Sequence, residues 1–128
     1  MSAGDFIGYD HVQLLCPPGG EGAARAYWRD VVGLTEVEKP VELRHRGGIW
    51  FRCGAHGLHV GAEVDFAPAA RAHPAIQLRD VEAFAALLER LRTAGYDVTM
   101  GDPPIAERRA KTHDPFGNLV EFVVGSTG

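Results

Sequence analysis

The feature that most constrains the fold of this chain is a spacing that occurs twice. His59 follows His11 by 48 positions, and Glu121 follows His73 by the same 48 positions. All four side chains are good ligands for a divalent metal ion. A spacing repeated within one sequence indicates a duplicated unit. We therefore expect two copies of one module, each contributing two ligands.

The pattern of apolar residues in the first half predicts one strand, one helix and three further strands. Alternation predicts a strand at 10–16, and helical spacing predicts a helix from about 22 to 32 that ends at Gly33. Short apolar segments separated by glycines then predict a meander. Its three strands are expected at 41–44, 49–53 and 57–60.

The second half repeats this order. We expect a strand at 75–78 and a helix from about 81 to 94 that is capped by Asp80 and closed by Gly95. Three strands are expected at 96–100, 107–112 and 119–124. The predicted fold class is α+β, with two βαβββ modules in one domain forming a curved mixed-sheet cleft that has its helices outside. The modules are expected at about 6–62 and about 72–125.

Composition limits the partners of the chain. Its 128 residues, 45% of them hydrophobic, suit one compact domain with a buried core. A net charge of −4 without a long basic run provides no surface for nucleic acid or for an anionic membrane. The sequence contains neither a signal-peptide pattern nor a run of about 18 apolar residues. We expect a soluble cytoplasmic protein whose partner is a small molecule.

Strand parity tests whether the four candidate ligands can point into the cleft. His11, His59 and Glu121 each have apolar neighbours that are expected to face the helix side, so these three side chains are expected to face the cleft. His73 is followed by Pro74, and we expect it at the entrance of its strand, where proline is tolerated.

Three more residues are candidates for substrate binding. Successive strand residues alternate, so either Trp50 and Arg52 or their strand neighbours face the cleft, and parity does not choose. Arg52 has a forked donor set that suits a carboxylate or phosphate, with a surface salt bridge as the alternative. His113 precedes a tight turn and is expected either at the cleft mouth or as a loop residue without a role. The segment 107–111 is expected to be solvated, with a basic lip for an anionic substrate as the alternative.

Four segments of the chain resemble the vicinal oxygen chelate superfamily, which includes glyoxalase I, bleomycin-resistance proteins, fosfomycin-resistance enzymes, methylmalonyl-CoA epimerase and extradiol dioxygenases. The segments are YDHVQL, AYWRDVVGL, HPAIQLRDVEAF and DPFGNLVEFV, which together span most of the chain. DPFGN followed by an apolar-acidic-apolar strand is the most specific of them. The resemblance implies that residues from the two modules together hold a single metal ion. Substrates are expected to bind this ion through adjacent oxygens.

The resemblance also implies roles for the four ligand-type residues. His11, His73 and Glu121 match a two-histidine, one-carboxylate ligand set, for which we expect Fe, Mn, Ni, Zn or Co. His59 occupies a position where glyoxalase I has a glutamate that takes part in proton transfer, which argues against the ordinary methylglyoxal reaction. His59 is therefore either a fourth ligand or a general base, and His59 and Glu121 are the candidate catalytic residues.

Two classes of function remain open from the sequence. The first is a metal-dependent enzyme, which is an isomerase, a lyase or a ring-cleaving dioxygenase. The second is a bleomycin-resistance-like protein that binds a small molecule or antibiotic without catalysis. The resemblance implies a homodimer, in which the cleft lies either inside one chain or between two.

Overall fold

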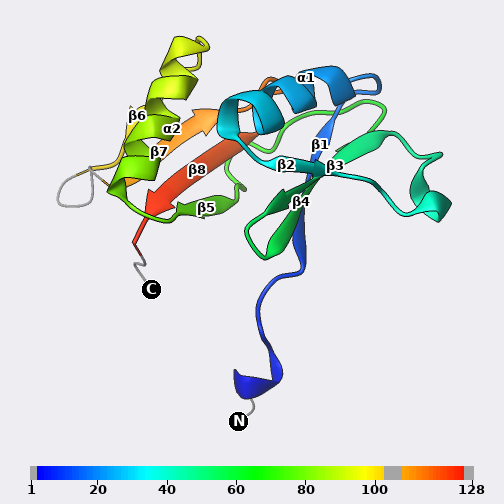
Figure 1. The fold of residues 1–128 in the computed structure, drawn as a ribbon. Coiled ribbons are helices and arrows are strands. Elements are labelled where there is room, and N and C mark those ends of the chain that lie inside the picture. Colours follow the sequence, from blue (N-terminus) through cyan, green and yellow to red (C-terminus); the bar gives the residue numbers. More distant parts are fainter. Residues whose placement is uncertain (1–2, 103–107, 126–128) are drawn as a thin grey trace.

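The structure, a computed structural model, describes residues 3–102 and 108–125 and contains two four-stranded sheets (Figure 1). The first sheet has the order β1-β4-β3-β2, and the second has the order β5-β8-β7-β6. In each sheet the first strand of the module runs parallel to the last, and the other neighbours are antiparallel. The predicted pair of βαβββ modules is confirmed. The strands are β1 (His11–Cys16), β2 (Thr35–Val37), β3 (Gly48–Cys53), β4 (His56–Ala62), β5 (Ala75–Leu78), β6 (Thr99–Met100), β7 (Arg109–His113) and β8 (Leu119–Val124).

The helical segment of the first module is confirmed, but part of it is wound differently from an α-helix. The short helix α1 (Glu21–Arg25) continues directly into η2 (Ala26–Val32), which is π-helical. Gly33 ends this segment with a φ of 99°, a left-handed conformation that glycine adopts without steric cost. A short 3₁₀ turn, η1 (Ala3–Asp5), precedes the first sheet.

The strand predicted at 41–44 is wrong. Val41–Leu43 forms a 3₁₀ turn, η3, and the strand beside β3 is Thr35–Val37 instead. Pro40 lies between these two segments and has no backbone N–H to donate to a sheet ladder. The outer strand therefore pairs before the proline, and the chain turns after it.

The second module follows its prediction more closely. Helix α2 (Val81–Thr93) begins after Asp80, whose Oδ1 accepts a hydrogen bond of 2.8 Å from the backbone N–H of Ala83. The strand expected at 96–100 is shorter, and the one expected at 107–112 appears as β7, with residue 107 outside the described residues. Among the residues described, no helix is long and apolar enough to cross a membrane.

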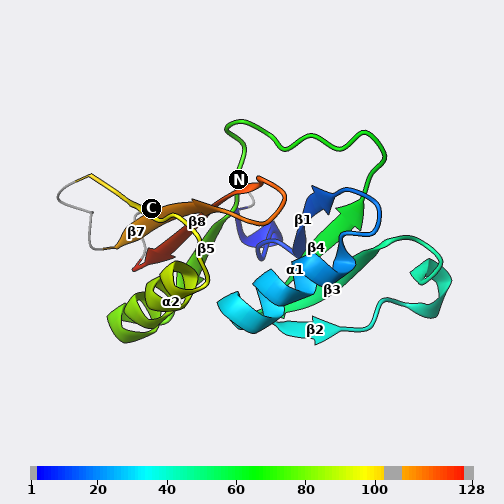
Figure 2. The ribbon, with the colours of Figure 1, turned by 90° about the horizontal axis from the view of Figure 1, so that it is seen from above.

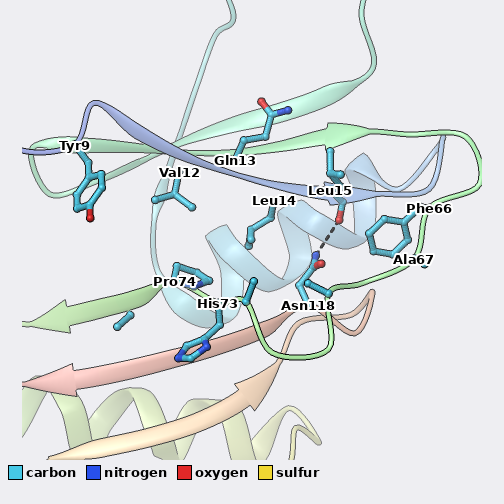
Figure 3. A pocket seen from close by; sticks show the side chains of 13 residues that line it. Tyr9, Val12, Gln13, Leu14, Leu15, Phe66, Ala67, His73, Pro74 and Asn118 are labelled. Carbon is cyan, nitrogen blue, oxygen red and sulfur yellow. Dashed lines mark hydrogen bonds between the residues drawn. The ribbon is translucent and has the colours of Figure 1, made fainter.

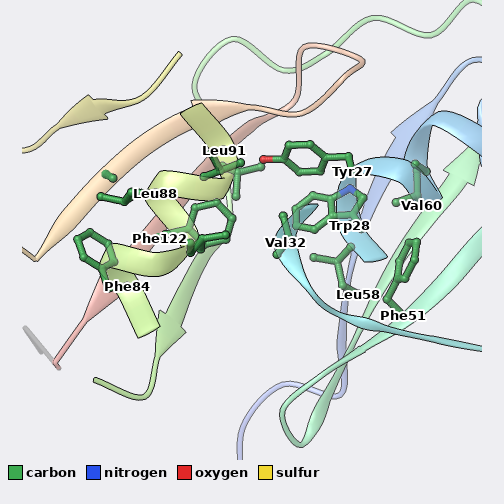
Figure 4. Packing of buried hydrophobic residues seen from close by; sticks show 14 of the residues in the cluster. Tyr27, Trp28, Val32, Phe51, Leu58, Val60, Phe84, Leu88, Leu91 and Phe122 are labelled. Atoms are coloured by element: carbon green, nitrogen blue, oxygen red, sulfur yellow. The ribbon is translucent and has the colours of Figure 1, made fainter. Parts of the chain in front are cut away.

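The two modules meet through their helical segments. Tyr27 and Trp28 of η2 are fully buried, and Figure 4 shows them between apolar side chains of both modules. The guanidinium of Arg90 in α2 donates to the carbonyls of Val31 at 2.8 Å and Val32 at 3.1 Å. The two sheets consequently lie next to each other along the molecule, each with its own helical cover (Figure 2).

Strands β1 and β5 each form one edge of their sheet, and β2 and β6 form the other edges. β1 and β5 are each paired on one side only, with β4 and β8 respectively. Within the described part of the chain no strand pairs with their other side. An edge strand presents unpaired backbone N–H and C=O groups that can pair with another chain. In the described part of the chain, the edges formed by β1 and β5 therefore leave backbone groups without a strand partner.

Candidate metal centre

The four predicted ligands form two pairs, one on each sheet. The rings of His11 and His59 stack, with centroids 4.2 Å apart. Beside the second sheet, Nε2 of His73, two residues before β5, lies 3.1 Å from Oε1 of Glu121 in β8. In residues 3–102 and 108–125, no three or more His, Cys, Asp or Glu side chains lie close enough together to hold a metal ion. We call these two pairs the candidate half-sites, the first made by His11 and His59 and the second by His73 and Glu121.

The first half-site is a stack of three rings on three neighbouring strands. Trp50 lies directly opposite His59 in the ladder between β3 and β4, and their rings are 3.8 Å apart with planes that differ by 2°. His11 lies opposite Gly57, so His59 reaches it diagonally. A Cβ on Gly57 would come within 2.9 Å of Nε2 of His59. Because Gly57 has no side chain, the His59 imidazole has room to lie between the rings of His11 and Trp50.

A hydrogen bond sets which nitrogen of His11 carries a hydrogen, and burial lowers the pKa of His59. Oδ2 of Asp10 lies 2.8 Å from Nδ1 of His11. A carboxylate only accepts, so Nδ1 carries a hydrogen in either charge state, and in the neutral ring Nε2 is left with a lone pair. This hydrogen bond and the charge of His11 lower the pKa of Asp10. Burial, and then the nearby charge of His11, lower the pKa of His59, which favours the neutral imidazole.

In the second half-site a buried carboxylate has both oxygens engaged. Glu121 is 5% exposed, with Oε1 facing His73 and Oε2 lying 2.5 Å from Nη1 of Arg109. Burial opposes ionisation of Glu121, but the hydrogen bonds from His73 and Arg109 outweigh it, and the pKa is lowered. The side chain is therefore ionised at neutral pH, as a candidate metal ligand must be.

The second half-site fits a cation. Nδ1 of His73 lies 2.8 Å from the carbonyl oxygen of Arg71, so Nδ1 is the donor. In a protonated ring Nε2 donates to Oε1 of Glu121. In a neutral ring Nε2 presents a lone pair instead, and a metal ion is then the positive centre that the two atoms need between them. Two ligand atoms about 2.1 Å from one ion, at right angles, are about 3 Å apart. The observed 3.1 Å between Nε2 and Oε1 is the length of a hydrogen bond, and it also fits two neighbouring ligands of one metal ion.

Each half-site opens into its own cavity. The first cavity, about 610 Å³, is lined by both histidines together with Trp50 and Arg52. Ile49 and Phe51, which alternate with Trp50 and Arg52 along β3, are buried in the core. Of the two sets that parity left open, Trp50 and Arg52 are therefore the pair on the side of the first cavity. The second cavity, about 450 Å³, is lined by residues that include His73, Glu121, Arg109 and Lys111. The two linings have no residue in common, and His113, exposed at the end of β7, belongs to neither.

A third cavity, about 710 Å³, lies along the free edges of both sheets (Figure 3). Val12 and Leu14 of β1 line one side, and His73 and Pro74, just before β5, line the other. The lining is mostly apolar, with Tyr9 at one end (Figure 3). The second half-site therefore adjoins an apolar space between the two modules.

Three contributors to the half-sites were not among the predicted site residues. Asp10 precedes His11 directly, and an acidic neighbour of a ligand histidine is a signal that the sequence does contain. Arg109 belongs to the segment 107–111, which was expected to be solvated, although it forms an ion pair with Glu121. Gly57 carries no chemical group, and its role depends on the strand register. Register was the missing information for the last two.

Comparisons with known proteins agree with this architecture. A family model described as the Glyoxalase/Bleomycin resistance protein/Dioxygenase superfamily matches residues 10–122. A solved glyoxalase family protein from Bacillus anthracis is 38% identical, with a TM-score of 0.84, over 94% of this chain and 97% of that one. A search of curated proteins finds no match.

Two more distant structures share the fold. The fosfomycin resistance protein FosX from Listeria monocytogenes is 15% identical, with a TM-score of 0.74, over 95% of this chain and 96% of that one. Lactoylglutathione lyase from Agrobacterium tumefaciens is 22% identical, with a TM-score of 0.71, over 94% of this chain and 95% of that one.

Proposed function

The chain belongs to the Glyoxalase/Bleomycin resistance protein/Dioxygenase superfamily, and on this premise we propose that it is a metal-dependent enzyme whose site is assembled from two copies. His11 of one copy joins His73 and Glu121 of the other around a divalent ion. The substrate is a small molecule that binds the ion through two adjacent oxygens. The observation that carries the proposal is the 3.1 Å separation of Nε2 of His73 from Oε1 of Glu121.

Three features of the single chain support assembly from two copies: separate half-sites, free strand edges and an exposed apolar arm. Its two half-sites face separate cavities, and β1 and β5 each have a free edge. Phe6, Ile7 and Tyr9 are 84%, 101% and 80% exposed on an N-terminal arm that projects from the sheets (Figure 1). The base of this arm is anchored to β4, because the N–H of Gly57 donates to the carbonyl of Asp10 at 2.9 Å. Large exposed apolar groups of this kind mark protein contacts.

The chemistry follows from the residues around the ion. A divalent metal, from the set Fe, Mn, Ni, Zn and Co, supplies a Lewis acid that stabilises negative charge on the substrate oxygens. A structure of FosX from Listeria monocytogenes contains Mn(II), which supports a metal of this class. His59, held in plane by Trp50 and His11, moves the proton. Arg52, at the rim of the same cavity, binds an anionic group of the substrate.

This arrangement favours a proton-transfer reaction of the lyase or isomerase type. Both faces of the His59 ring are covered by other rings, so its nitrogens act at the ring edge, toward the cavity. Ring cleavage by a dioxygenase would consume oxygen in proportion to the substrate. Oxygen uptake during turnover therefore separates the two reaction classes.

Metal analysis of the purified full-length chain tests the proposal. We expect about one transition-metal ion per chain in the unaltered protein and its loss in His73→Ala and Glu121→Ala. His45→Ala, which removes an exposed histidine outside both half-sites, is the matched control and should keep the metal. A chain without metal that binds a bulky antibiotic equally well with and without chelator would instead be a non-catalytic binding protein.

Mixing two inactive variants tests whether the site is shared. His11→Ala and Glu121→Ala each destroy every site in their own homodimers. A mixed dimer retains one intact site, made by His11 of one variant with His73 and Glu121 of the other. Random pairing of equal amounts should restore about a quarter of the wild-type metal binding. No recovery after the mixture has been refolded together would place the site within one chain.

A further inference from the structure

The two oxygens of Glu121 have different partners, and this difference defines a role for Arg109. Oε1 faces Nε2 of His73 at 3.1 Å, and Oε2 faces Nη1 of Arg109 at 2.5 Å. We propose that Arg109 is a positioning residue that holds Oε2, so that Glu121 offers only Oε1 to the metal. This inference rests on the proposed function of the second half-site.

The pairing of Glu121 with Arg109 is not the one that the strand register favours. In the ladder between β7 and β8, Lys111 lies directly opposite Glu121, and Arg109 lies opposite Val123. Glu121 nevertheless forms its ion pair diagonally with Arg109. Lys111 is exposed and has no ion pair among the described residues, although it lines the same cavity. Arg109 and Lys111 lie on the same face of β7, but only Arg109 forms an ion pair with Glu121 among the described residues.

Partial burial of Arg109 and Glu121 fixes the geometry of their ion pair. The side chain of Glu121 is 7% exposed and that of Arg109 is 26% exposed. Charge-assisted hydrogen bonds between a guanidinium and a carboxylate are short and geometrically specific, and partial burial protects them from screening by salt. Rotation of the carboxylate would break this contact, so its plane is held. The consequence is a one-oxygen ligand in a fixed orientation beside His73.

Removing Arg109 has two opposing effects on metal affinity. Loss of the held orientation weakens binding, and groups that orient metal ligands in this way typically contribute tenfold to a hundredfold. Loss of a positive charge near the ion strengthens binding. Lys111→Met removes a cation from the same strand and the same cavity but leaves the Glu121 contact intact. It therefore measures the charge effect alone.

The experiment is a calorimetric titration of the metal-free, full-length protein with Mn(II) and with Co(II). Relative to Lys111→Met, we expect Arg109→Met to bind both ions about tenfold to a hundredfold more weakly. We also expect a changed visible spectrum of the Co(II) form, because a carboxylate released from Arg109 can bind through both oxygens and alter the coordination number. Arg109→Lys keeps the charge without the fork and should lie between the two in affinity.

The outcomes separate this inference from the proposed function. Equal affinity and an identical Co(II) spectrum in Arg109→Met and Lys111→Met would overturn the role of Arg109 and leave the metal site standing. Failure of the unaltered protein to bind either ion would overturn both. A purely structural role of Arg109 would lower the thermal unfolding temperature of the metal-free protein without changing the Co(II) spectrum. Should Arg109→Met not fold, the comparison of Arg109→Lys with the unaltered protein decides, because the two carry the same charge and only a positioning role predicts weaker binding in Arg109→Lys.

Discussion

The indole of Trp50 lies parallel to the imidazole of His59, with ring centroids 3.8 Å apart, and His11 continues the stack on the other face of His59. The three residues come from β3, β4 and β1, so the stack depends on the register of two strand pairs. Stacking on both faces limits how far the imidazole can tilt. The candidate proton carrier is thus held by ring contacts beside a candidate metal ligand.

Gly57→Ala should displace the His59 ring. The added Cβ would lie 2.9 Å from Nε2 of His59, so the ring must shift from its place in the stack to relieve this contact. We expect the ring protons of His59 to lose the upfield NMR shift that the indole imposes. If substrate turnover is measurable, a displacement of this kind should reduce kcat on the order of a hundredfold.

Gly61→Ala is the matched control for this change. It lies on the same strand, but its Cβ would approach the side chain of Gln13, at 3.0 Å, and not the ring stack. The His59 shift should therefore stay at its wild-type value in Gly61→Ala. An unchanged shift in Gly57→Ala would show that the glycine is not needed for the stack.

The stability of the metal-free chain should depend on pH through Glu121. Burial opposes its ionisation, but the hydrogen bonds from His73 and Arg109 lower its pKa below the ordinary 4.5. The stabilisation is fully present above the pKa of unfolded glutamate and is lost as the pH falls through the lower, folded-state pKa. We expect the advantage of the wild type over Glu121→Gln in free energy of unfolding to shrink below about pH 4.5.

Urea unfolding in the presence of a chelator, from about pH 6 to about pH 3, measures this dependence. Glu89→Gln, an exposed residue of α2, provides the control for a general effect of losing one carboxylate. A stability difference between wild type and Glu121→Gln that stays constant over this range would contradict the assigned pKa direction.

The N-terminal arm should contribute to association of two copies. Phe6 and Ile7 are 84% and 101% exposed in one chain, and burial of each against a partner contributes about 1.5–3 kcal/mol. We expect the double variant Phe6→Ser, Ile7→Ser to raise the dimer dissociation constant at least about tenfold. Sedimentation equilibrium measures the constant, and Val81→Ser, an apolar residue of α2 that is 58% exposed, is the control. Unchanged association of the double variant would remove the arm from the interface.

Asn118 should stabilise the contact between the modules. Its Nδ2 donates at 2.8 Å to the carbonyl of Leu15 in β1 and at 2.9 Å to Oδ2 of Asp114 (Figure 3 shows the first bond). Asn118→Ala leaves both acceptors without this donor, and a buried group left unpaired costs about 1–3 kcal/mol. We expect a loss of that size in urea unfolding, and less than about 0.5 kcal/mol for the exposed Gln77→Ala. Equal losses in the two variants would show that these bonds do not hold the modules together.

Local patterns were enough to predict most of the elements. The cap at Asp80, the left-handed end at Gly33 and the strands 75–78 and 119–124 all appear where short-range rules place them. The error at 41–44 arose because apolar residues there resemble a strand, whereas the pairing of β2 with β3 is decided by contacts between distant segments.

The sequence by itself determined the duplication, the α+β modules and the four ligand-type residues, because each depends on spacing along the chain or on residue chemistry. Only the tertiary structure decided that these residues form two separate pairs, that Trp50 stacks on His59, and that Arg109 forms an ion pair with Glu121. Those relationships depend on strand register and on the modules meeting through their helical segments. Both are set by packing between residues far apart in sequence, which spacing along the chain does not encode.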